Sequence, residues 1–80
     1  MVADTFARTI RAFAKREPFR PFVVELVSGA RVTVGHPEAL VFGNKTAVYL
    51  DPEGDITIFD HQGVARFTDV TDQRQRPGRR

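Results

Sequence analysis

Two histidines, each close to a carboxylate, are the residues with the most obvious capacity for chemistry. His36 lies two positions before Glu38, and Asp60 immediately precedes His61. Imidazole and carboxylate groups serve as zinc ligands and as general acids and bases, provided that the fold brings them together. The sequence lacks the HxH and HExxH spacings that place two ligands on one element. We therefore interpret both histidines as structural residues, and we expect no enzymatic activity, no metal and no other cofactor.

Other patterns that would indicate an enzyme are weak. Ser28 is the only serine, stands in a predicted turn and has no obvious partner histidine. The chain contains no cysteine, which excludes a disulfide framework and a CxxC-type zinc or redox site. The glycine at position 43 lies between two predicted strands, whereas a phosphate-binding loop leads into a helix. These patterns favour a binding protein over an enzyme.

Basic residues gather at the two ends of the chain. Residues 1–20 contain five basic and two acidic residues, a net charge of +3. Residues 21–73 contain three basic and eight acidic residues, a net charge of −5, and residues 74–80 carry +4. A polyanion such as RNA is therefore expected to meet the N-terminal helix or the C-terminal tail. The candidate nucleic-acid-binding residues are Arg8, Arg11, Lys15, Arg74, Arg76, Arg79 and Arg80.

Both basic segments have an alternative interpretation. The basic side of the helix is either an ordinary solvated face or a surface for phosphate groups. The tail 74–80 either attracts phosphates through counterion release or is a solubilising extension without a partner. The segregation of charge thus locates any polyanion site without establishing one.

The candidate residues Arg8, Arg11 and Lys15 are expected to lie on a single amphipathic helix, over residues 4–16. Apolar residues recur at positions 6, 10, 13 and 14, which gives one apolar stripe with the basic residues on the opposite side. Asp4 is a suitable N-cap, and Pro18 disfavours helix at the residue before it.

After the segment PFRPF, the period of apolar residues changes from 3.6 to 2. The segments with strand-like patterns lie at 22–27, 31–34, 39–42, 46–50, 56–59 and 64–67. We expect about five short strands, with a hairpin turn at Ser28-Gly29, a second turn at 51–55, and bends at Gly35 and Gly63. Seven phenylalanines could stack on bases, but we assign most of them to the core, with Tyr49 as the exposed ring.

The predicted fold is therefore α+β and mostly β, in a single domain over residues 1–71. An N-terminal helix precedes a five-stranded, bent antiparallel small barrel whose strands lie within residues 20–69. Residues 72–80 are predicted to form a disordered basic tail. No apolar run approaches the roughly 18 residues of a membrane span, and no apolar signal segment begins the chain, so we expect a cytoplasmic protein without a membrane partner.

The sequence resembles a family of small uncharacterised bacterial proteins. Members of that family share a PFxPF segment, an Asp/Asn-Gly or Ser-Gly hairpin, a His-Pro-Glu/Asp segment, and a late strand that ends in apolar-x-Arg. In this chain the corresponding residues are 18–22, 28–29, 36–38 and 64–66. The match covers roughly residues 17–68, and the family implies no established activity.

The order of elements resembles Sm-like proteins, in which a helix precedes an SH3-like barrel of five strands. Residues 26–32 are similar to the first Sm sequence motif around its hairpin, and residues 59–64 resemble the Tyr-Lys-His linker of the bacterial Sm-like RNA chaperones, with Asp60 in place of the lysine. The resemblance implies rings built by pairing of edge strands, and RNA binding.

Two functions from different classes follow from these observations. The first is a non-catalytic small-barrel module that forms a homo-oligomer through its edge strands and binds RNA or another polyanion. The alternative is a structural or protein-interaction module that assembles through strand edges with no nucleic-acid role. A chain of this length buries only about 60% of its unfolded surface, which favours oligomerisation in both cases.

Overall fold

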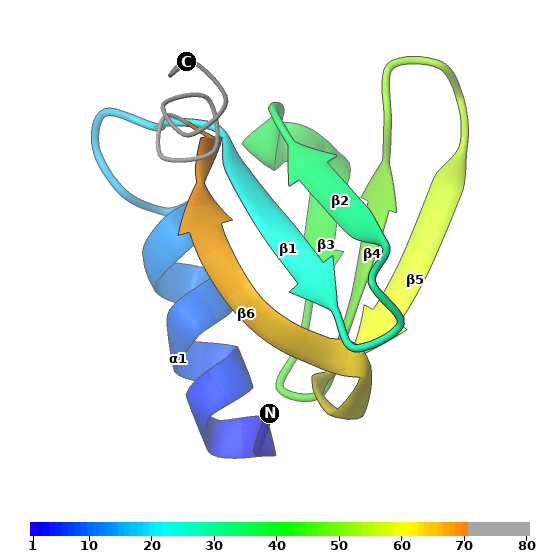
Figure 1. Cartoon of the computed structure of the whole chain (residues 1–80). Coiled ribbons are helices and arrows are strands. Elements are labelled where there is room, and N and C mark those ends of the chain that lie inside the picture. Colours follow the sequence, from blue (N-terminus) through cyan, green and yellow to red (C-terminus); the bar gives the residue numbers. More distant parts are fainter. Residues whose placement is uncertain (71–80) are drawn as a thin grey trace, which may run out of the picture.

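The computed structural model describes residues 1–70 of the 80-residue chain. Within this range the chain forms one helix, six strands and two short 3₁₀ turns (Figure 1). The elements are α1 (Ala3–Ala14), β1 (Phe22–Leu26), β2 (Arg31–Val34), η1 (Pro37–Ala39), β3 (Leu40–Phe42), β4 (Thr46–Leu50), β5 (Ile56–Asp60), η2 (His61–Gly63) and β6 (Val64–Asp69). The expected basic tail at 72–80 lies outside the described residues.

The six strands form two antiparallel sheets of three strands each. The strand orders are β2-β1-β6 and β3-β4-β5, so the chain passes between the sheets at η1 and again at η2. Pro37 has no backbone N–H and begins η1, which explains why the ladder of β2 is interrupted before β3. The expected α+β class is confirmed. The closed five-stranded barrel is not confirmed, since no pairing joins the two sheets within residues 1–70.

Helix α1 lies beside β6 and contacts both that strand and η2 (Figure 1). Phe6 and Ile10 are fully buried, as the apolar stripe predicts. The helix begins one residue earlier and ends two residues earlier than the expected range 4–16, at Ala3 and Ala14. Asp4 as an N-cap was wrong: the N-cap is Val2, and the Asp4 carboxylate lies in the first turn, 3.2 Å from Arg8 Nη2.

The core lies between the two sheets and α1. Strand alternation places Phe22 and Val24 of β1 and Ala47 and Tyr49 of β4 on the inner faces. The buried cluster consists of Phe6, Ile10, Phe22, Val24, Val32, Val34, Leu40, Ala47, Tyr49, Phe59 and Val64.

The aromatic residues are almost all used in packing. All seven phenylalanines belong to this cluster or pack against it, as expected. The expectation that Tyr49 is an exposed ring was wrong, since it is only 2% exposed. Its hydroxyl oxygen accepts a hydrogen bond from the N–H of Gly35, at 3.2 Å, and this contact allows a polar atom to lie at the core.

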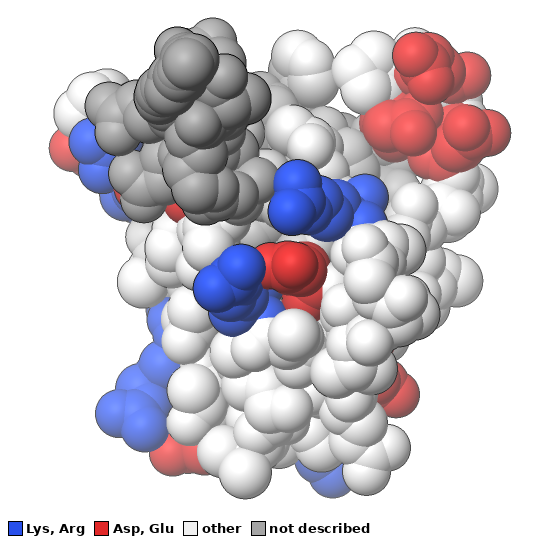
Figure 2. Space-filling model, in the orientation of Figure 1, with Lys and Arg blue, Asp and Glu red and all other residues white. Residues whose placement is uncertain are grey.

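The outer face of the β2-β1-β6 sheet is mostly polar, with one buried apolar residue, Val23, between Thr33 and Thr68. Glu25 of β1 is in register with Arg31 of β2 and with Arg66 of β6, which places one acidic and two basic residues in a row. The Glu25 Oε1 atom lies 2.6 Å from Arg66 Nε. Acidic and basic side chains accordingly lie together near the centre of the view in Figure 2. Apart from Val23, this face has the composition of an ordinary solvated surface.

The helix of the described part of the chain is too short and too polar to cross a membrane.

Candidate interaction surface

The outer face of the β3-β4-β5 sheet is apolar, in contrast to that of the other sheet. In β4, Ala47 and Tyr49 point to the core, so Val48 and Leu50 lie on the outer side. Exposure is 70% for Val41, 48% for Leu50, 65% for Ile56 and 68% for Ile58, and Val48 is half-buried. We call the set Val41, Val48, Leu50, Ile56 and Ile58 the apolar face.

The register of the strands makes the apolar face continuous. Val41 pairs with Val48, and Val48 pairs with Ile58, so one row of β-branched side chains crosses all three strands. Leu50 pairs with Ile56 in the neighbouring row. Directly paired residues on one face have Cβ atoms about 5 Å apart, which brings these side chains into contact. The exposed side chains present on the order of 500 Å² of apolar surface, near the top of the range for the largest patch on a monomer.

Charged residues flank both ends of the apolar face. At one end, the turn between β4 and β5 carries Asp51, Glu53 and Asp55, whose carboxylate oxygens lie within 4.8 Å of one another. This acidic turn forms the red patch at the upper right of Figure 2. Asp51 Oδ1 accepts the N–H groups of Glu53 and Asp55 at 3.0 and 2.9 Å, so the cluster has a structural role in the turn. At the other end lie Lys45, which immediately precedes β4, and Asp60, which pairs with Thr46, and both residues are exposed.

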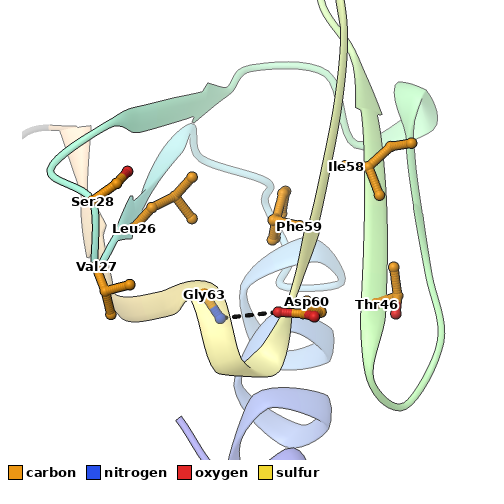
Figure 3. A pocket seen from close by; sticks show the side chains of 8 residues that line it. All are labelled: Leu26, Val27, Ser28, Thr46, Ile58, Phe59, Asp60 and Gly63. Carbon is orange, nitrogen blue, oxygen red and sulfur yellow. Dashed lines mark hydrogen bonds between the residues drawn. The ribbon is translucent and has the colours of Figure 1, made fainter.

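A pocket of about 350 Å³ adjoins the apolar face. It lies between the β1-β2 hairpin and β5, and Figure 3 shows Leu26 and Phe59 pointing toward one another across it. Ile58 belongs both to the pocket lining and to the apolar face. At the lower edge, the Asp60 carboxylate is directed to the N–H of Gly63, which it accepts at 3.0 Å. The pocket lining is mixed: Leu26, Val27, Ile58 and Phe59 are apolar, whereas Ser28, Thr46 and Asp60 have polar side chains.

The two histidines each have a local partner. His36 Nδ1 lies 3.6 Å from Glu38 Oε2, and both side chains are exposed. His61 Nδ1 lies 2.9 Å from the carbonyl oxygen of Met1, which ties the start of the chain to η2. Among residues 1–70, the triad of potential metal ligands whose atoms lie close together is that of the acidic turn, and neither histidine belongs to it.

The predicted basic residues of the helix lie on one side of it, as their spacing requires. Arg8 Nη2 pairs with Asp4, and both side chains are highly exposed. The guanidinium carbon of Arg11 lies 5.9 Å from the centroid of the Phe42 ring, while Lys15 is exposed at the C-cap of α1. The predicted tail residues Arg74, Arg76, Arg79 and Arg80 lie outside the described residues.

The apolar face was missed by sequence reasoning, although a signal for it exists. Residues 47–50 are continuously apolar, a pattern typical of a strand that is covered on both sides. Ile56 and Ile58 alternate with Thr57 and Phe59, so both faces of β5 also carry large apolar groups. Both β4 and β5 therefore carry large apolar side chains on two faces, of which the core covers one.

Comparison with protein-family models, with curated proteins and with solved structures found no match.

Proposed function

We propose that this chain is a non-catalytic protein-interaction module, and that its binding surface is the apolar face. The carrying observation is the exposure of four large apolar side chains side by side on one sheet, while the outer face of the other sheet is mostly polar. Scattered apolar residues are common on protein surfaces, whereas the largest contiguous patch on a protein is often functional, and this patch lies near the top of the size range found on monomers. The partner class is therefore a protein with a complementary apolar surface.

An SH3-like small barrel is the arrangement that we propose for the whole domain. In this interpretation β2, η1 and β3 form one long, sharply bent strand that belongs to both sheets, so that the six strands count as five. The order of the strands and the two crossings at η1 and η2 support it. A barrel of this size is filled by side chains, which favours binding at its outer surface over catalysis in its interior.

Site-specific photo-cross-linking in the producing cells tests the proposed surface. A photoreactive side chain at Ile56, on the apolar face, is expected to form adducts with protein. The matched control is the same residue at Thr33, which is exposed on the other sheet and is expected to give none. Absence of protein adducts at Ile56, or equal adducts at both positions, would contradict the proposal.

Polyanion binding by the helix and the tail is the second candidate function. It is supported by Arg8, Arg11 and Lys15, which lie at spacings of three and four residues along α1 with exposed side chains. Only Arg8 among them has an ion pair within residues 1–70. RNA is the expected polyanion, because the resemblance to Sm-like proteins points to it.

A gel-shift assay separates this second candidate from the first. Full-length protein is compared with a chain that ends at Asp72, both with single-stranded RNA at several salt concentrations. If all four tail arginines engage phosphates, their removal should flatten the slope of log affinity against log salt by about 3 units. Absence of a shift at low salt for the full-length chain would eliminate the second candidate and leave the first unaffected.

A further inference from the structure

We propose that the partner of the apolar face is a second copy of this chain, which seats its own apolar face against the first with the strands running antiparallel. This inference rests on the proposed function and adds to it the identity and the orientation of the partner. Three observations carry it: the area of the apolar face, the charges at its two ends, and the position of the apolar side chains relative to the strand edges.

The area of the apolar face matches what a stable dimer requires. A specific interface of standard size buries about 800 Å² on each partner, of which about 56–65% is apolar. The apolar face provides on the order of 500 Å², and its polar margins provide the remainder. Two such sheets pack face to face about 10 Å apart, with β-branched side chains interdigitating as in a sandwich.

The charges at the ends of the apolar face select the antiparallel orientation. A two-fold axis along the strands would bring the acidic turns of both copies together, and six carboxylates would repel one another. A two-fold axis across the strands instead brings Lys45 of each copy to the acidic turn of the other. If the β4 strands cross at Val48, position 45 of one copy lies opposite position 51 of the other. Asp60 lies at the same end, on the side of β5 that carries Ile58, and it keeps its negative charge while its Oδ1 accepts the N–H of Gly63. That end therefore carries one basic and one acidic residue, and the antiparallel orientation is favoured chiefly because it separates the two groups of three carboxylates.

Pairing of two copies through the edge of β5 would leave the exposure of the apolar face unexplained. The free edge of β5 can extend the sheet by hydrogen bonding to a second β5. In that arrangement the apolar faces of both copies would lie side by side in one six-stranded sheet, and the exposed apolar area would double. Face-to-face packing is the arrangement that removes Val41, Leu50 and Ile58 from water.

The oligomeric state of purified full-length protein is the first test. Sedimentation equilibrium should show a dimer that dissociates on dilution. Ile58→Lys should give a monomer at the same concentration, because it places two ammonium groups at the centre of an apolar interface. Thr33→Lys introduces the same charge on the other sheet and should leave the dimer intact. Circular dichroism checks that both variants remain folded.

The orientation is tested by cross-linking, for which the absence of native cysteine is an advantage. Protein with Lys45→Cys is mixed with protein with Glu53→Cys and oxidised. The mixed disulfide should form much faster than either symmetric disulfide. A charge exchange gives a second measurement: Lys45→Glu should raise the dissociation constant about tenfold, and adding Glu53→Lys should restore it to within about twofold.

Each outcome of these experiments is decisive. A monomer at every concentration, a dimer that survives Ile58→Lys, or preferential symmetric disulfides would overturn the antiparallel face-to-face dimer. The proposed function has a separate criterion: photo-adducts at Ile56 with a different protein would support it while they eliminate the second copy as the partner. Adducts between two copies of this chain would support both.

Discussion

Arg16 Nη2 lies 2.5 Å from Asp69 Oδ1, although the two residues are 53 positions apart in the sequence. The same nitrogen donates to the carbonyl oxygen of Arg20 at 3.0 Å, and the guanidinium group lies 4.8 Å from the centroid of the Phe13 ring. Arg16 therefore connects the end of α1, the segment that leads into β1 and the end of β6. With 18% and 33% exposure, the two side chains are shielded enough for this pair to contribute to stability.

Asp69→Ala is expected to lower the free energy of unfolding by about 1–2 kcal/mol, because it leaves a largely buried guanidinium group without its carboxylate. Urea denaturation of both proteins measures the difference. The matched control is Asp4→Ala, which removes the exposed pair with Arg8 and should leave the urea midpoint almost unchanged. Equal effects of the two substitutions would show that the Arg16–Asp69 contact has no special role.

Phe6→Ala is expected to lower the free energy of unfolding by about 3–4 kcal/mol. Phe6 is completely buried, and its ring lies 6.4 Å from that of Phe59 and 6.3 Å from that of Phe67, so the truncation opens a cavity where α1 meets both sheets. Phe19→Ala removes the same atoms at a half-buried position and should have a clearly smaller effect. A loss at Phe19 as large as at Phe6 would contradict a core centred between α1 and the two sheets.

Tyr49→Phe tests the one hydrogen bond that the tyrosine hydroxyl receives from the backbone. The substitution preserves the ring but leaves the Gly35 N–H without this acceptor, so the free energy of unfolding should fall by about 1 kcal/mol. Tyr49→Leu also removes ring contacts and should cost more. Hydrogen exchange provides a local measurement: the amide of Gly35 should exchange faster in Tyr49→Phe, and an unchanged rate would argue against the contact.

Gly54→Ala is expected to destabilise the turn between β4 and β5 by about 1 kcal/mol. Gly54 has φ of +96°, a conformation that residues with a Cβ adopt at a cost. The control is Gly43→Ala, since Gly43 lacks a positive φ and, among residues 1–70, nothing lies within 4 Å of an added Cβ at either glycine. Thermal unfolding should therefore show a lower midpoint for Gly54→Ala alone, and a similar decrease for both would point to a cause other than backbone strain.

Local pattern is sufficient to predict most of the elements. The apolar spacing of Phe6 and Ile10 locates the buried side of the helix, and Gly29, with φ of +97°, occupies the turn where the Ser-Gly pair indicates a hairpin. The sequence-based predictions fail where a contact between residues far apart in the sequence determines the structure. The periodicity places Arg16 at the end of the helix, yet the structure directs it to Asp69, a residue that no local pattern connects with it.

Tyr49 and the apolar face illustrate the same limit in the strands. In a run that is apolar on both sides, alternation defines two faces but does not say which of them meets the core. Tyr49 was expected to be exposed, whereas the structure buries it and exposes Val48 and Leu50 to a greater degree. Only the positions of the second sheet and of α1 determine which face of β4 meets the core. The candidate interaction surface is the face that is left exposed.

The pairing of β1 with β6 also determines how the two sheets depend on the length of the chain. The β3-β4-β5 sheet joins consecutive segments, so all of its strand pairings are local in the sequence. The β2-β1-β6 sheet joins residues more than 40 positions apart, and the contact of α1 with β6 also requires the last strand. By contact order, the β3-β4-β5 sheet, which carries the apolar face, is therefore expected to form before the sheet that closes the core.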